Sequence, residues 1–178
     1  MTSLVDRVLS IAAALDDSGI GWALGGALAL AYATEEPRGT RDIDVNVFVP
    51  SAAVSEVFAA LPPGIAHSAD DERSVFDSDQ VRLWWDDTPV DLYFAASDFH
   101  VQAATRTRRV PFAGSHVNIL AAEDLAVFKA LFDRSRDWVD IDEMSAAGAL
   151  DRKVAAERLA SLLDSDDPRI ARLAATGT

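Results

Sequence analysis

Apolar residues recur along this chain with two different periods, and the period changes from one stretch to the next. A spacing of four, as at Leu4, Val8 and Ala12, is typical of a helix with one buried face, whereas strict alternation, as at Val90 and Leu92, is typical of a strand. The patterns predict helices over residues 4–15, 27–33, 51–60 and 97–107, and strands over residues 20–24, 42–48, 81–85, 90–94 and, as a hairpin, 110–119.

The last third of the chain carries only helical patterns, which predict helices over residues 121–134, 138–147 and 151–163 and weaker helicity after Pro168. The segment from His67 to Asp79 is polar and acidic, and we expect it to be an exposed loop. Strands first and helices last predict an α/β (α+β) fold with a short mixed sheet, flanking helices and a helical C-terminal half. We expect one domain over residues 1–178, with the sheet in residues 1–120 and the helical part in residues 121–178.

The charge of the chain limits its partners. The 178 residues include 16 basic and 29 acidic side chains, for a formal net charge of −13. This balance argues against broad nonspecific binding to nucleic acid or to an anionic membrane, so a nucleic-acid substrate would need a local basic patch. Arg106, Arg108 and Arg109 form one dense basic cluster, which is either a solvated helix end or a patch for an anionic acceptor.

Other classes of protein are excluded by residue usage. The chain has no cysteine, which excludes disulfides and thiolate zinc sites, and its three histidines are too scattered for a metal motif. The apolar stretch over residues 20–33 is shorter than the roughly 20 residues that cross a bilayer. There is no pattern of a secretion signal at the N-terminus. We therefore expect a cytoplasmic protein without membrane contact.

Three aspartates on two predicted strands follow a glycine pair. The strand period places Asp42 and Asp44 on one face, and Asp91 lies in a second apolar strand. Two carboxylates this close repel each other unless a divalent cation neutralises them, and Mg²⁺ binds through one or two carboxylates together with water and phosphate oxygens. Gly25 and Gly26, at the start of a helix, would offer backbone amides to phosphate oxygens. The pattern predicts a site for metal ions and a triphosphate.

The same residues carry a family resemblance. The series Gly25-Gly26, then Arg38-Gly39-Thr40-Arg41-Asp42-Ile43-Asp44-Val45, then Val90-Asp91-Leu92 resembles the DNA polymerase β-like nucleotidyltransferase superfamily. Within it, Lys129 and the segment Arg136-Asp137-Trp138-Val139-Asp140-Ile141 are similar to the C-terminal motifs of the bacterial AbiEii and MenT toxins. The resemblance covers roughly residues 20–144. In two respects the chain departs from the pattern: many members have serine at the position of Gly26, and the distance from Gly26 to Asp42 is longer.

This resemblance implies transfer of a nucleoside monophosphate from an NTP to an acceptor, with release of pyrophosphate and with two Mg²⁺ ions. Asp42 and Asp44 would hold both ions, and Asp91 would bind the ion on the acceptor side. The expected catalytic residues are thus Asp42, Asp44, Asp91 and Lys129, and the expected nucleotide-binding residues are Gly25, Gly26, Arg38, Thr40, Arg41, Lys129 and Asp137.

Several of these residues also have a simpler structural interpretation. A lysine on a helix, such as Lys129, is usually solvated. The alternative for Arg38 and Arg41 is a surface pair that balances Glu35 and Glu36. Asp137 is most simply the N-cap of a helix that begins at Trp138.

Three functions compete. The first, which comes from the resemblance, is a toxin of a toxin–antitoxin system that transfers NMP to the 3′ end of tRNA, blocks translation and binds a cognate antitoxin. The second keeps the chemistry and changes the acceptor to a small molecule such as an aminoglycoside, or to a protein side chain, because an acidic protein attracts cations. The third is a non-catalytic antitoxin or regulator with the same fold, which the absence of a serine at Gly26 suggests.

Overall fold

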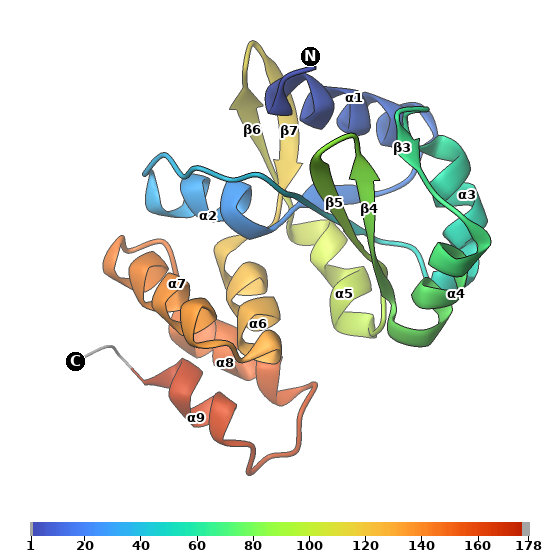
Figure 1. The fold of residues 1–178 in the computed structure, drawn as a ribbon. Coiled ribbons are helices and arrows are strands. Elements are labelled where there is room, and N and C mark those ends of the chain that lie inside the picture. Colours follow the sequence, from blue (N-terminus) through green and yellow to red (C-terminus); the bar gives the residue numbers. More distant parts are fainter. Residues whose placement is uncertain (1, 176–178) are drawn as a thin grey trace.

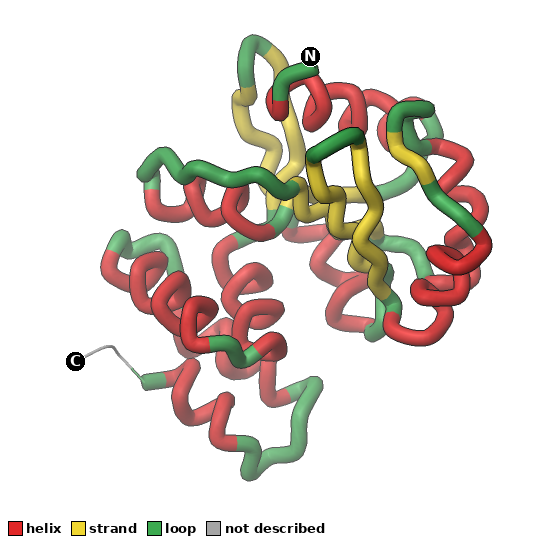
Figure 2. Tube along the Cα trace, in the orientation of Figure 1, coloured by secondary structure: helices red, strands yellow, loops and turns green. Residues whose placement is uncertain are grey.

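The structure, a computed structural model, describes residues 2–175 (Figure 1). Helices and strands are mixed up to residue 119, and only helices follow (Figure 2). The helices are α1 (Leu4–Asp17), α2 (Gly26–Thr34), α3 (Val54–Ala60), α4 (Ala69–Ser78), α5 (Asp98–Ala103), α6 (Ala122–Phe132), α7 (Ser135–Ala146), α8 (Arg152–Ala160) and α9 (Pro168–Ala174), with 3-10 turns η1 (Ser51–Ala53) and η2 (Ala104–Arg106). The strands are β1 (Trp22–Leu24), β2 (Ile43–Val47), β3 (Ile65–Ala66), β4 (Gln80–Trp85), β5 (Thr88–Tyr93), β6 (Arg108–Phe112) and β7 (Ser115–Ile119).

The described strands form one mixed sheet in the order β3-β4-β5-β2-β1-β7-β6. At its centre β2 runs parallel to β5 and antiparallel to β1. The register of β2 and β5 pairs Asp44 with Asp91 and Asn46 with Tyr93. Because side chains alternate along a strand, these four residues share one face of the sheet. This arrangement confirms the mixed α/β fold that the hydrophobic pattern predicts.

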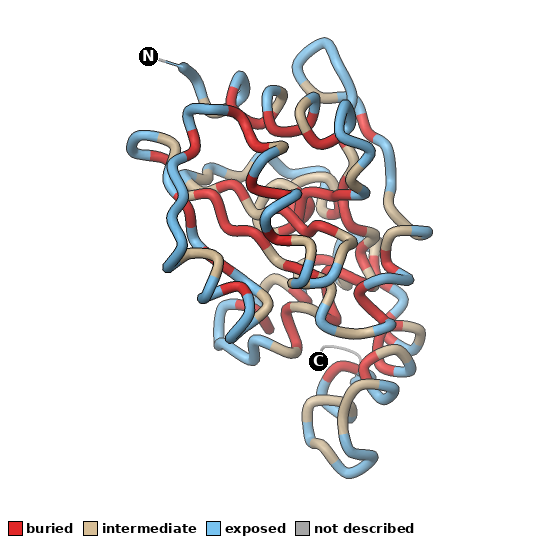
Figure 3. Tube along the Cα trace, turned by 90° about the vertical axis from the view of Figure 1, so that its right-hand side faces the viewer, coloured by how far each residue is buried: buried red, intermediate tan, exposed pale blue. Residues whose placement is uncertain are grey.

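The opposite face of the sheet is part of the hydrophobic core. Ile43, Val45 and Val47 of β2 are fully buried there, and they belong to the same buried cluster as the apolar residues of α1 and α3. Buried positions gather in the interior between the sheet and its helices, and exposed positions follow the outer loops and helix faces (Figure 3). The apolar positions of β2 therefore hold the strand rigidly while its polar positions face a site.

The segment from His67 to Asp79 is not the exposed loop that its polarity suggests, because residues 69–78 form α4. Ser68 caps this helix: its side chain accepts a hydrogen bond from the Asp71 amide, and the Asp71 carboxylate accepts one from the Ser68 amide at 2.7 Å. Acidic residues in the first turn are favourable beside the positive end of the helix dipole. Only Val75 of α4 is buried, so the helix has a very narrow apolar stripe. Because α4 has a single buried position, the hydrophobic periodicity of the sequence does not reveal this helix.

The C-terminal helices are joined to the sheet part through a buried ion cluster. Asp124 of α6 is fully buried, and it accepts hydrogen bonds from Arg106 of η2 at 2.9 Å and from Arg158 of α8 at 2.8 Å. The predicted basic cluster is therefore divided, because Arg106 is structural whereas Arg108 and Arg109 are exposed on β6. Between residues 2 and 175 no helix has the length and apolarity needed to cross a membrane.

Candidate active site

The predicted acidic residues meet at the centre of the sheet. Asp44 and Asp91 are direct partners on β2 and β5, so their side chains stand next to each other on one face. Asp42 lies immediately before β2, where the Thr40 hydroxyl donates a hydrogen bond of 2.5 Å to Asp42 Oδ1. The structure thus places Asp44 beside Asp91. It leaves Asp42 just before the same strand, with Thr40 to orient it.

The Asp44 carboxylate has no ion-pair partner among the described residues. Burial, together with the negative charges of Asp42 and Asp91, raises its pKa to about 6, and the Lys129 charge offsets part of this rise. The Tyr93 hydroxyl donates to Asp44 Oδ1 at 3.4 Å, and burial raises the pKa of that phenol. Because a carboxylate with a raised pKa is stabilised by an added cation, Asp44 is a good ligand for a metal ion.

Steric crowding explains why glycine occupies positions 25 and 26. Gly26 has a φ of +49°, and a Cβ atom at this position would overlap the Asp44 carboxylate. A Cβ atom at Gly25 would lie 2.8 Å from Asn46 Nδ2, and the Gly25 amide already donates to the Asp44 carbonyl at 2.9 Å. With Asp44 in this position a serine does not fit at residue 26. The departure from the family pattern therefore follows from how closely α2 approaches β2.

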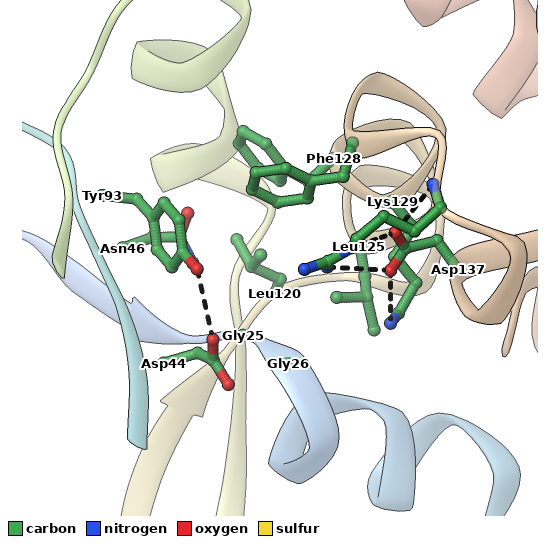
Figure 4. A pocket seen from close by; sticks show the side chains of 12 residues that line it. Gly25, Gly26, Asp44, Asn46, Tyr93, Leu120, Leu125, Phe128, Lys129 and Asp137 are labelled. Carbon is green, nitrogen blue, oxygen red and sulfur yellow. Dashed lines mark hydrogen bonds and ion pairs between the residues drawn. The ribbon is translucent and has the colours of Figure 1, made fainter. Parts of the chain in front are cut away.

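Lys129 and Asp137 come from the C-terminal helices and form the opposite wall of a cavity (Figure 4). We call it the inner cavity, and its lining includes Gly26, Asp44, Tyr93, Phe128, Lys129 and Asp137. Lys129 is buried, with Nζ 2.5 Å from Asp140 Oδ2 and 3.7 Å from Asp137 Oδ1. This burial rules out the simple solvated interpretation of Lys129.

Asp137 is not the N-cap of α7, because that helix begins at Ser135 and Asp137 is its third residue. Its carboxylate accepts hydrogen bonds from the Arg134 amide at 3.2 Å and from Arg134 Nε at 2.6 Å. Burial alone would raise the pKa of Asp137, but the hydrogen bonds and charge of Arg134 and the charge of Lys129 lower it below its ordinary value. Asp137 thus stays ionised and anchors two basic residues at the cavity.

Asp91 differs from the other two carboxylates because it has a basic partner. Arg82 of β4 lies directly opposite it in the antiparallel register. Arg82 Nε donates to Asp91 Oδ1 at 2.7 Å, and Nη2 donates to Oδ2 at 2.6 Å. Both residues line a second cavity of about 390 Å³ beside α4, which we call the outer cavity and whose lining includes Asp71, Ser74, Ser78, Gln80, Arg82 and Asp91.

The two arginines expected to bind the nucleotide lie elsewhere. Arg38 pairs with Glu143 of α7 and lies 3.7 Å from Asp140, so it ties the loop before β2 to the C-terminal helices. Arg41 is exposed. Neither is among the described residues that line the inner cavity. A nucleotide-binding role for either stays a prediction.

Sequence reasoning did not select Arg82, Tyr93 or Arg134 as site residues. Tyr93 lies two residues after Asp91, so the strand period was a usable signal for it. Arg82 required the hairpin register, which depends on the turn consisting of Asp86 and Asp87 alone. Arg134 had no signal in the sequence, because it reaches the cavity through the packing of α6 against α7.

The donor set fits one divalent cation better than two. In the part of the chain that the structure describes, no group of three or more His, Asp or Glu side chains is close enough to hold a metal ion together. Asp42 and Asp44 supply oxygens without a basic partner, whereas both Asp91 oxygens are taken by Arg82. The residues present thus fit a cation at Asp42 and Asp44.

Comparison with known proteins identifies the fold. No protein-family model and no curated protein matches the sequence. Among solved structures, the antibiotic-resistance factor ANT(2'')-Ia is similar with a TM-score of 0.60 at 16% identity, over 89% of this chain and 90% of that one. The lincomycin-bound lincosamide antibiotic adenylyltransferase LnuA has a TM-score of 0.53 at 12% identity, over 79% of this chain and 96% of that one.

A nucleotidyltransferase-like protein from Paracoccidioides brasiliensis also has a TM-score of 0.53, at 14% identity over 94% of this chain and 91% of that one. Each of these neighbours shares its fold with this chain at low sequence identity. The chain therefore has the nucleotidyltransferase fold that the sequence resemblance implies.

Proposed function

We propose that this protein is a magnesium-dependent nucleotidyltransferase that transfers a nucleoside monophosphate from an NTP to a hydroxyl group of a small molecule. One observation carries the proposal. Asp44 lies against the start of α2 and Asp42 precedes it by two residues, and no basic side chain among residues 2–175 lies within ion-pair distance of either carboxylate. An unpaired carboxylate pair at a helix N-terminus is suited to a metal-bound triphosphate.

In this proposal Asp42 and Asp44 hold the metal, which when bound supplies positive charge to the phosphate oxygens. The first amides of α2, which have no partner within the helix, donate to phosphate oxygens. Lys129 adds a positive charge at the far wall of the inner cavity. The acceptor oxygen bonds to the α-phosphorus as the bond to the β-phosphate oxygen breaks, so that pyrophosphate leaves and solvent takes the hydroxyl proton.

A small-molecule acceptor has three supports. The outer cavity, at about 390 Å³, falls within the range of roughly 300–1,000 Å³ that is usual for small ligands. The net charge of −13 opposes binding of a polyanion. Two neighbours of the same fold are described with small antibiotics, ANT(2'')-Ia with adenylyl-2''-tobramycin and LnuA with lincomycin. The tRNA acceptor and the antitoxin partner remain predictions from the sequence resemblance.

The test is an assay with α-labelled NTP, Mg²⁺ and a panel of acceptors that includes aminoglycosides, lincosamides and total tRNA. We expect label to enter a small hydroxylated acceptor with release of pyrophosphate. Asp44→Asn should lower this rate by about a thousandfold or more, because the metal loses a principal ligand. Asp87→Asn, at an exposed turn position, serves as the matched control and should keep the wild-type rate.

Two results contradict the proposal in different ways. Label in tRNA and in no small molecule would replace the acceptor and restore the toxin hypothesis. NTP binding with Mg²⁺ but no pyrophosphate from any acceptor would favour the non-catalytic regulator.

A further inference from the structure

The Arg82–Asp91 pair lies next to Asp44 and lines the outer cavity. The pair is bidentate, with both Asp91 oxygens hydrogen-bonded to the guanidinium at 2.7 and 2.6 Å. Asp91 belongs to β5, which lies between β4 and β2 in the sheet, and its side chain is only 11% exposed. The Arg82 side chain is 53% exposed, so it approaches Asp91 from the open side, where the outer cavity lies.

The three carboxylates are therefore satisfied unequally. Asp42 accepts from Thr40, and Asp44 accepts from Tyr93 at 3.4 Å, and both donors are neutral hydroxyls. We call Asp42, Asp44 and Asp91 together the carboxylate row. Within the described residues, the cation in ion-pair contact with this row is Arg82, which pairs with Asp91. Within the described residues, Asp42 and Asp44 thus have no ion-pair partner, whereas Asp91 has one.

We propose that Arg82 is a positioning residue that takes the place of a second metal ion on the acceptor side, so that the loaded site holds one divalent cation, on Asp42 and Asp44. This inference rests on the proposed function. A guanidinium is always protonated, and its planar fork matches the two oxygens of a carboxylate. A second ion at Asp91 would first have to break both hydrogen bonds, and the register of the β4–β5 hairpin places Arg82 directly opposite Asp91.

The position of Arg82 also explains how a positive charge reaches the acceptor. Arg82 and Asp91 line the outer cavity together, so an acceptor hydroxyl that approaches Asp91 meets the guanidinium as well. The positive charge that a second ion would place near the attacking oxygen is then part of the protein. The same guanidinium fixes the orientation of the two Asp91 oxygens through its two hydrogen bonds.

The experiment counts Mn²⁺ ions bound per chain by electron paramagnetic resonance and isothermal titration, with a non-hydrolysable NTP analogue present. We expect one ion in the wild type and two in Arg82→Ala, because the substitution frees both oxygens of Asp91. Arg82→Lys keeps a cation beside Asp91 and should bind one ion. Arg109→Ala removes an exposed strand arginine at the other edge of the sheet, and it should also bind one.

The outcomes separate this inference from the proposed function. Two ions in the wild type, or one ion in both the wild type and Arg82→Ala, would overturn the role of Arg82 and leave nucleotidyl transfer intact. Absence of Mn²⁺ binding in folded wild-type protein would overturn both. A thermal melt of each variant confirms that the counted protein is folded, and a second ion in Arg82→Ala that is lost again in Arg82→Ala/Asp91→Asn places that ion on Asp91.

Discussion

The two ends of the carboxylate row are built in opposite ways. At the Asp44 end, Gly25 and Gly26 lie close to the carboxylate, and the inner cavity is narrow. No basic side chain of the described residues forms an ion pair with Asp44. At the Asp91 end, a side chain from the neighbouring strand neutralises the charge, and the cavity is wide and open to solvent. Both carboxylates come from adjacent positions of one sheet, so the difference lies entirely in their surroundings.

The contrast shows how one pair of strands can carry two chemical roles. A carboxylate left without a counter-ion destabilises the folded protein and binds a metal ion more strongly when one is supplied. A carboxylate with its own arginine costs less to keep ionised and is already oriented. Three further predictions address this contrast, from the largest expected effect to the smallest.

Gly26→Ala should disrupt the packing around the Asp44 carboxylate. The new methyl group would overlap the Asp44 carboxylate, and φ at this position is +49°, which favours glycine. We expect the free energy of unfolding to fall by about 2 kcal/mol and the transfer rate to fall about a hundredfold. Chemical denaturation and the labelled-NTP assay measure the two effects.

Gly39→Ala is the matched control, because a Cβ atom there meets nothing within 4 Å and the residue lies in the loop that leads to the same strand. Its stability and rate should stay at the wild-type values. If Gly26→Ala keeps full activity, the close approach of α2 to Asp44 has no part in the reaction.

The pH dependence of stability should expose the unpaired charge at Asp44. In the metal-free protein its pKa is raised to about 6, from 3.8, mainly by burial, so between these values the folded state binds more protons than the unfolded state. Its contribution to stability is present below pH 3.8 and is lost as the pH rises through 6. Two pKa units correspond to about 3 kcal/mol.

His100 has the opposite effect over the same range. Burial between Phe48 and Phe128 lowers its pKa to about 4, from 6.5, so stability is lost as the pH falls through this window. In the wild type the two slopes oppose each other. In Asp44→Asn only the His100 slope remains, so the variant should gain about 2–3 kcal/mol relative to the wild type between pH 4 and pH 7, measured by denaturation in chelator. A constant difference across that range would show that Asp44 titrates normally.

Thr40→Val should give the smallest effect. It removes the hydroxyl that orients Asp42 without touching Asp44 or Asp91. We expect Mn²⁺ affinity to fall about fivefold, or about 1 kcal/mol, as for loss of one hydrogen bond to a ligand. Thr34→Val, which removes a hydroxyl bonded within α2, is the control and should leave the affinity unchanged. Equal affinities in the two variants would mean that Asp42 needs no orienting partner.

The sequence was sufficient for the parts of the site that depend on strand period. Asp42 and Asp44 could be placed on one face because alternation along a strand is fixed by backbone geometry. The structure adds the pairing of β2 with β5, which sets Asp91 beside Asp44. The mixed sheet and the later helices followed from the same periodicities. The segment over residues 69–78 did not, because a helix with one buried position has almost no periodic signal and depends on its Ser68 cap.

The charge partners depend on tertiary contacts, which no local pattern encodes. Arg82 meets Asp91 only in one hairpin register, and a turn longer by one residue would place it on the other face. Arg38 reaches Glu143, more than a hundred positions away along the chain, and does not line the inner cavity as Lys129 does. The steric role of Gly26 likewise depends on where α2 packs against β2.

The buried cluster around Asp124 limits how this protein is recombined with its relatives. Its carboxylate accepts hydrogen bonds from Arg106 of the sheet part and from Arg158 of the helical part. Removing either part would leave a buried charge without one of its partners, which is costly inside a protein. The two parts are therefore not interchangeable modules, and a chimaera has to bring along all three residues.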